Sequence, residues 1–154
     1  MTETHRINIQ LKAAHQGNSW HGPSLRELLD GVTAAQAAQH LLPETHSIWE
    51  LVNHIRAWEA IVTRRAQGHV VSDIADEMNF PPVTDASEAA WEAALQQLAE
   101  TNRQLRDAIQ QLSAEQLNEM ATGKTHPLYF ELHGALEHTL YHAGQIALLK
   151  KALA

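Results

Sequence analysis

Apolar residues recur at helical spacing along most of the chain. In residues 47–66, for example, Leu51, Ile55 and Trp58 follow one another at intervals of four and three positions. This spacing places them on one face of an α-helix, where they can pack against a core. The same pattern predicts four main helices, over residues 7–16, 47–66, 87–112 and 128–149.

Turn-forming residues separate these helices. Gly or Pro occurs within 17–23, 42–43, 79–82 and 123–127 and at position 68. These residues end helices or form turns. We expect a short helix over 24–29 and a turn from Thr33 after the first helix, and a loop over one end of the bundle at 70–86. No internal repeat or linker is visible, so we expect a single domain over residues 1–154.

The composition favours an all-α fold, because only 7 Gly and 5 Pro occur in 154 residues and Ala, Leu, Gln and Glu dominate. The formal net charge of −7 argues against a nucleic-acid partner, which requires clustered positive charge. The chain contains no run of 18 apolar residues and no apolar segment near its N-terminus. We therefore expect a cytoplasmic protein with no membrane partner.

Histidine supplies the candidate chemistry. The chain has 11 His and no Cys, so any transition metal must be held by imidazole and oxygen ligands. The absence of cysteine also excludes a disulfide framework and a cysteine nucleophile.

The last predicted helix carries a row of polar side chains. Between 132 and 149 its only Asp, Glu, Lys or Arg is Glu137, so we expect it to be the most buried helix. Helical spacing nevertheless places four polar residues on one of its faces: Glu131, His138, His142 and Gln145. A buried polar row needs hydrogen-bond partners or a ligand.

Three histidines are expected to face one core. His138 and His142 are four positions apart, so their rings point the same way, and His54 lies in the apolar stripe of residues 47–66. Taken singly, each is better interpreted as a neutral core histidine with a hydrogen-bond partner. Taken together they favour a metal site, because burying three imidazoles without a cation is costly. In the zinc protease motif a glutamate directly follows the first histidine, but here Thr139 follows His138, which argues against a protease of that type.

The other polar and aromatic residues are given simpler roles. Gln145 or Glu131 can orient a ligand imidazole or a bound water, or else bond the helix backbone or solvent. Tyr141 can reach the pocket, although helix packing is the favoured role, and Gly144 is expected to let a neighbouring helix approach. We expect the other eight histidines in solvent or at helix ends, with His46 and His133 as the best reserve candidates for the site. The four tryptophans are expected in the core or lining a pocket: Trp20, Trp49, Trp58 and Trp91. Arg56, Arg64 and Arg65 are expected on a solvated face, where one of them could meet an anionic substrate.

Two segments resemble the DinB superfamily: HSIWELVNHIRAWE at 46–59 and GALEHTLYHAGQIALLK at 134–150, of which HTLYHAGQI is the more specific part. Weaker similarity covers WHGPSLRELL at 20–29, the Asn79-Phe80-Pro81 stretch and the helix containing Trp91. The resemblance implies a four-helix bundle with up-up-down-down order. It also implies that His54, His138 and His142 bind a divalent metal such as zinc or nickel.

The resemblance leaves several functions open. Related proteins act as transferases or isomerases that use a low-molecular-weight thiol such as bacillithiol, mycothiol or glutathione, and many others have no assigned activity. We expect a metal-dependent enzyme that activates such a thiol or, as a hydrolase, water, for a small-molecule substrate. The alternatives are a non-catalytic metal- or ligand-binding or stress-response protein, and a structural bundle. Because bundles of this type commonly pair, a homodimer is also expected.

Overall fold

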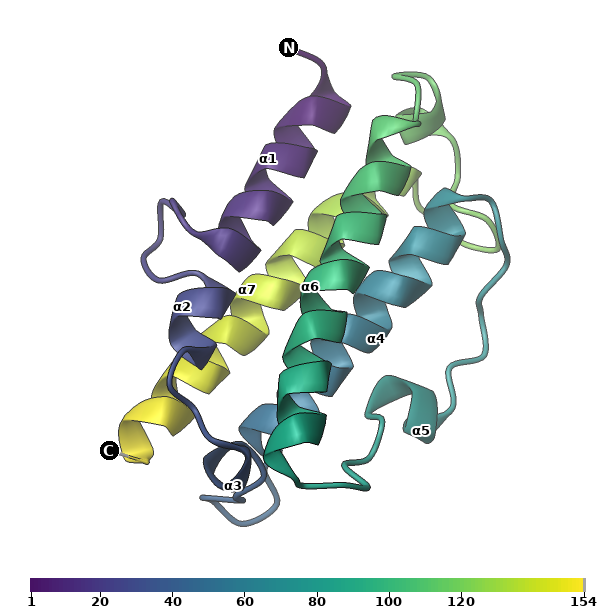
Figure 1. Ribbon diagram of the computed structural model, residues 1–154. Helices are drawn as coiled ribbons and strands as arrows, with labels where there is room; N and C mark the ends of the chain where they lie inside the picture. The colour runs from purple at the N-terminus through teal and green to yellow at the C-terminus, as the bar shows by residue number, and fades with distance from the viewer. Residues whose placement is uncertain (154) are drawn as a thin grey trace.

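The computed structural model describes residues 1–153, which form seven α-helices and a short 3-10 helix (Figure 1). Within that range the only β-type pairing is an isolated bridge between Met120 and Pro127, so the all-α prediction is confirmed. In chain order the helices are α1 (Glu3–Gln16), α2 (Leu25–Leu29), α3 (Ala34–Ala37), α4 (Ile48–Ala66), α5 (Asp76–Asn79), α6 (Glu88–Gln110), the 3-10 helix η1 (Gln116–Asn118) and α7 (Leu128–Ala152).

Side-chain capping marks where α4 and α6 begin. The hydroxyl of Ser47 accepts from the backbone N–H of Glu50, whose carboxylate accepts from the N–H of Ser47. This reciprocal pair satisfies two donors at the start of α4. The Ser87 hydroxyl accepts from the N–H of Ala90 at the start of α6 in the same way. These two starts match the predicted ones.

Helices α4 and α6 run parallel. The rings of Trp49 and Trp91 lie 5.0 Å apart, and ten residues further along α4 the carboxylate of Glu59 accepts from Asn102 at 3.1 Å. Residue numbers therefore rise together along both helices. The connection from 67 to 87 makes this possible, because it returns along the side of the bundle to the end where α4 began (Figure 1). The prediction that residues 70–86 form a loop over one end is wrong.

Helices α1 and α7 run opposite to this pair. On α7, Glu131 meets Arg65 near the end of α4, whereas His138 meets His54 near its start. On α1, Asn8 donates to the carbonyl of Arg106 near the end of α6. The order of the four main helices is therefore down-up-up-down, and the predicted up-up-down-down order is wrong.

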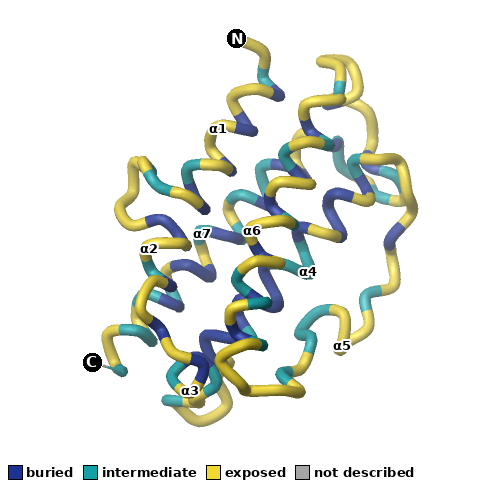
Figure 2. The backbone as a smooth tube through the Cα atoms, in the orientation of Figure 1, coloured by how far each residue is buried: buried dark blue, intermediate teal, exposed yellow. Residues whose placement is uncertain are grey.

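The core lies between these helices, and α4 is its most buried member (Figure 2). Twelve of the 19 residues of α4 are buried, against eight of the 25 of α7. The prediction that the last helix is the most buried is wrong, because some apolar side chains of its weakly charged stretch face outward, namely Tyr141 and Leu148. A Cβ on Gly144 would meet no atom of another helix within 4 Å in residues 1–153, so the expected close helix approach is also wrong.

Two further assignments are corrected by burial. Trp49 and Trp91 are core residues as expected, but Trp20 is fully exposed. His15, expected at a helix end in solvent, is 5% exposed and bonds the buried carboxylate of Glu59 at 2.7 Å.

Candidate metal centre

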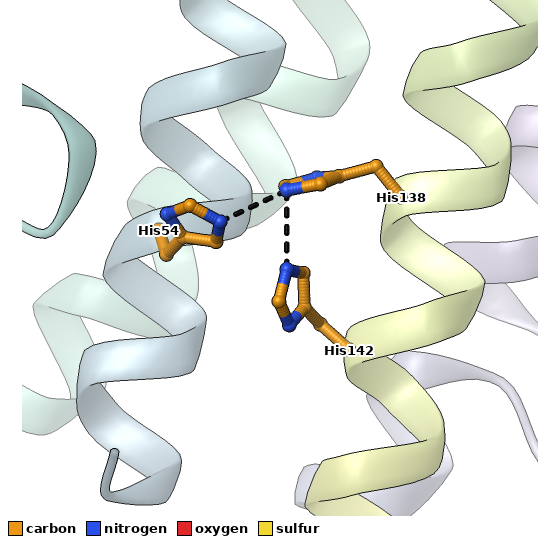
Figure 3. A group of neighbouring side chains, drawn as sticks. All are labelled: His54, His138 and His142. Atoms are coloured by element: carbon orange, nitrogen blue, oxygen red, sulfur yellow. Dashed lines mark hydrogen bonds between the residues drawn. The ribbon is translucent and has the colours of Figure 1, made fainter. Parts of the chain in front are cut away.

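The rings of His54, His138 and His142 converge in the space between α4 and α7 (Figure 3). The Nε2 atom of His138 lies 2.9 Å from Nε2 of His54 and 3.1 Å from Nε2 of His142. One ligand atom from each residue lies within 4.8 Å of the other two. One turn of α7 separates His138 and His142, and the antiparallel α4 brings His54 opposite both of them.

The outer nitrogens of two of these rings have fixed partners. The carbonyl oxygen of Asn79 lies 2.5 Å from Nδ1 of His54, and Oε1 of Gln145 lies 2.6 Å from Nδ1 of His142. A carbonyl oxygen accepts, so both Nδ1 atoms carry the proton and both Nε2 atoms present lone pairs.

The result is a centre with more acceptors than donors. Nε2 of His138 faces the Nε2 lone pairs of His54 and His142 at 2.9 and 3.1 Å and can carry at most one proton. One of the two contacts is then left without a good hydrogen bond. Three converging imidazole nitrogens suit a divalent transition metal, and the residues present therefore fit such an ion.

Burial keeps these histidines neutral. It lowers the pKa of His138 to about 3, with further lowering by the charges of the neighbouring His142 and His54 rings. Burial also lowers the pKa of His54 and of His142, although the bonds to Asn79 and Gln145 oppose the shift. A neutral imidazole is the form that binds a metal.

The segment around α5 supports His54. The ring of Phe80 stacks on that of His54 with centroids 3.9 Å apart, and Oδ1 of Asn79 accepts from the Trp58 indole at 2.9 Å. Asn53 donates to the carbonyl of Pro81 at 3.1 Å, which ties the same segment to α4. The sequence pattern gave Asn79 and Phe80 no role at the site, and their only signal was the weak Asn-Phe-Pro similarity.

Gln145 and Glu131, which share one face of α7 in the sequence pattern, have different contacts in the structure. Gln145 contacts His142, whereas Glu131 lies two turns before His138 on α7 and accepts from Arg65 at 2.9 Å and from His126 at 3.1 Å. Arg65 is buried and also donates to the carbonyl of Val71. The expectation of a solvated face is therefore wrong for Arg65.

A cavity of about 490 Å³ opens over the three histidines. The Arg65–Glu131 pair and His126 lie at its other end, and Trp58, Val62 and Phe130 contribute apolar walls. Tyr141 lines it with its ring centroid 5.0 Å from that of His142 and is 67% exposed. The preferred helix-packing role of Tyr141 is therefore wrong. A cavity of this size is typical of small-molecule sites.

The fold and this site define a helical bundle with a three-histidine centre that could hold a metal ion. The sequence profile of the DinB superfamily matches residues 19–146, and the chain belongs to that superfamily. All three histidines fall within the matched range. No curated protein and no solved structure matches the chain. No helix in residues 1–153 is both long and apolar enough to cross a membrane.

Proposed function

We propose that His54, His138 and His142 bind one divalent metal ion, zinc or nickel, through their Nε2 atoms. The observation that carries this proposal is the convergence of three Nε2 atoms while the Nδ1 protons of His54 and His142 are held by Asn79 and Gln145. A hydrogen bond on the outer nitrogen is the usual support of a metal-bound histidine.

The metal would act as a Lewis acid that lowers the pKa of a water or thiol bound to it. The protein's own residues would set the conditions for that chemistry. Phe80 covers one face of the His54 ring, which excludes water from that side. Gln145 fixes the orientation of His142, and the cavity beside Tyr141 leaves one side of the centre open to a small molecule.

We favour a metal-dependent transferase that activates a low-molecular-weight thiol. The chain has no cysteine, so a thiolate must arrive with a separate molecule. The cavity is long enough for one, because Glu131 and His138 are seven residues apart on α7, about 10 Å along the axis. His126 and Glu131 would then contact polar groups of the thiol or of the small-molecule substrate. A hydrolase that activates water is the second form of the same proposal.

The alternative is a metal- or ligand-binding protein without turnover, such as a stress-response bundle. Its site would be the same, and only a catalytic assay separates the two. A homodimer stays a prediction, which light scattering on the purified protein would test.

Metal analysis of untagged protein tests the proposal. After expression with added zinc or nickel, the wild type should hold about one equivalent, and His54→Ala, His138→Ala and His142→Ala should each hold less than about a tenth. His133→Ala, on the same helix but outside the trio, serves as the control and should keep its metal. Unchanged metal in all three variants would contradict the proposal.

A screen of electrophiles with bacillithiol, mycothiol and glutathione, and of hydrolysable esters and amides without thiol, tests the reaction type. Metal-dependent conjugation supports the transferase, and hydrolysis without thiol supports the hydrolase. A metal-loaded protein that turns over nothing in either panel supports the non-catalytic alternative.

A further inference from the structure

A carboxylate is buried where the four main helices meet. Glu59 of α4 is 1% exposed, and its Oε1 contacts His15 of α1 at 2.7 Å, Asn102 of α6 at 3.1 Å and Thr139 of α7 at 3.4 Å. Its Oε2 is buried without a hydrogen-bond partner in residues 1–153. A buried carboxylate oxygen that lacks a donor is costly. The hydrogen-bonding capacity of Glu59 is therefore incompletely used at this point of the core.

A second cavity, of about 530 Å³, lies between α2 and α6. His15 and Asn102, which both contact Glu59, form part of its lining. In the tautomer in which Nε2–H of His15 donates to Glu59, Nδ1 is the remaining acceptor of the ring. The cavity thus has a polar floor that can accept a proton donor.

The walls and the rim of the cavity have different character. Leu25, Leu29, Trp91, Leu95 and Leu98 form apolar walls. Three exposed carboxylates, Asp30, Glu88 and Glu92, also line it, against one guanidinium, from Arg26. An excess of one charge around a low-dielectric cleft attracts ligands of the opposite charge.

From these features we infer that the cavity is a second ligand site, distinct from the three histidines, for a small organic amine. The hydrocarbon part of the amine packs against Trp91 and the leucines. The ammonium group donates to Nδ1 of His15 at the floor, because Asn102 already donates to Glu59 and accepts from Arg106. The acidic rim adds electrostatic attraction. Neutral and anionic ligands of the same shape lack this electrostatic attraction.

Calorimetric titration of the metal-free wild type tests this inference with three probes of similar size: 2-phenylethylamine, 2-phenylethanol and 3-phenylpropanoate. The amine is expected to bind saturably with one site per chain, the alcohol more weakly, and the carboxylate not at all. Repeating the titration with His138→Ala tests whether the amine binds at the three-histidine centre instead. The affinity of this variant for the amine is expected to equal that of the wild type. Absence of saturable amine binding, or alcohol binding as tight as amine binding, would overturn the inference.

Two matched pairs of variants locate the site. Ala99 lines the cavity and is exposed, so Ala99→Trp fills the cavity from the surface and should abolish amine binding, whereas Ala60→Trp, at an exposed position of α4 outside it, should not. Glu92→Gln should weaken binding roughly two- to fivefold, as expected for one exposed charge. Glu137→Gln, an exposed carboxylate on α7, should leave it unchanged. Binding that is equal in Ala99→Trp and the wild type would place the amine elsewhere and overturn the inference.

Discussion

The carbonyl oxygen of Asn79 lies 2.5 Å from Nδ1 of His54, so the α5 segment determines which nitrogen of His54 faces the other two histidines. A backbone carbonyl has no protonation states to exchange, and it holds the imidazole in one tautomer. The position of this carbonyl depends in turn on the side chains that anchor residues 79–81 to α4.

Removing the ring of Phe80 should weaken metal binding. Phe80→Ala removes the stack on His54 at 3.9 Å and also the stack on His46 at 3.7 Å, which frees the segment that carries the Asn79 carbonyl. We expect the metal Kd to rise about 10- to 100-fold, the usual effect of losing outer support of a ligand, as measured by competition with a chromophoric chelator. Met78→Ala, in the same segment but 43% exposed, is the control. Equal affinity in Phe80→Ala and the wild type would show that the stack has no supporting role.

Gln145 should act on His142 in a similar way. Gln145→Leu has similar volume but offers no acceptor to the Nδ1 proton of His142, whereas Gln145→Glu retains one. The leucine variant should bind metal about 10- to 100-fold more weakly, and the glutamate variant should recover much of this loss. Chelator competition on both variants gives the comparison. If the leucine variant binds as tightly as the glutamate variant, the bond does not support the metal site.

The buried Arg65–Glu131 pair should matter for stability. Glu131→Ala leaves the Arg65 guanidinium buried with only the Val71 carbonyl as partner. Breaking a buried pair in this way costs about 3–5 kcal/mol, which urea unfolding of the metal-free protein would measure. Arg103→Ala removes two exposed ion pairs on α6, with Glu100 and Asp107, and should cost less than about 1 kcal/mol. Similar costs for the two variants would contradict the structural role of the Arg65–Glu131 pair.

The three histidines should make the metal-free protein sensitive to acid. Their pKa values in the folded state lie below the ordinary 6.5, with that of His138 at about 3. As the pH falls, the unfolded chain therefore binds protons before the folded one does. The contribution of these neutral histidines to the free energy of unfolding is fully present above pH 6.5 and is lost progressively toward pH 3. We expect Tm to fall between pH 7 and pH 4.5, and to fall less steeply in His138→Gln. Parallel pH profiles for the two proteins would contradict the pKa lowering of His138.

Local patterns predicted much of this fold. Apolar spacing predicted the starts of α4 and α6, and the inward direction of His54 followed from its place between Leu51 and Trp58. Helix directions could not be read this way, because they depend on the path of residues 67–87. Nothing in that stretch indicates whether it crosses one end of the bundle or returns along its side.

The candidate site shows the same division. The histidines share helical faces, so spacing brought them together, but the Asn79 carbonyl and the Phe80 ring come from a loop that has no periodicity. The burial of Arg65 was missed because its partner, Glu131, is 66 residues away. The low charge of residues 132–149 led to an overestimate of the burial of α7. A helix can carry few charges and still expose apolar side chains such as Tyr141 and Leu148.

The most direct test of the central claim is a crystal structure of the zinc-loaded protein with anomalous diffraction data recorded on both sides of the zinc absorption edge. We expect one strong peak in the anomalous difference map, about 2.0–2.1 Å from Nε2 of each of His54, His138 and His142. The Nδ1 atoms of His54 and His142 should still face Asn79 and Gln145. A peak at other residues, or no peak between α4 and α7 in crystals that contain zinc, would contradict the assignment of these histidines as metal ligands.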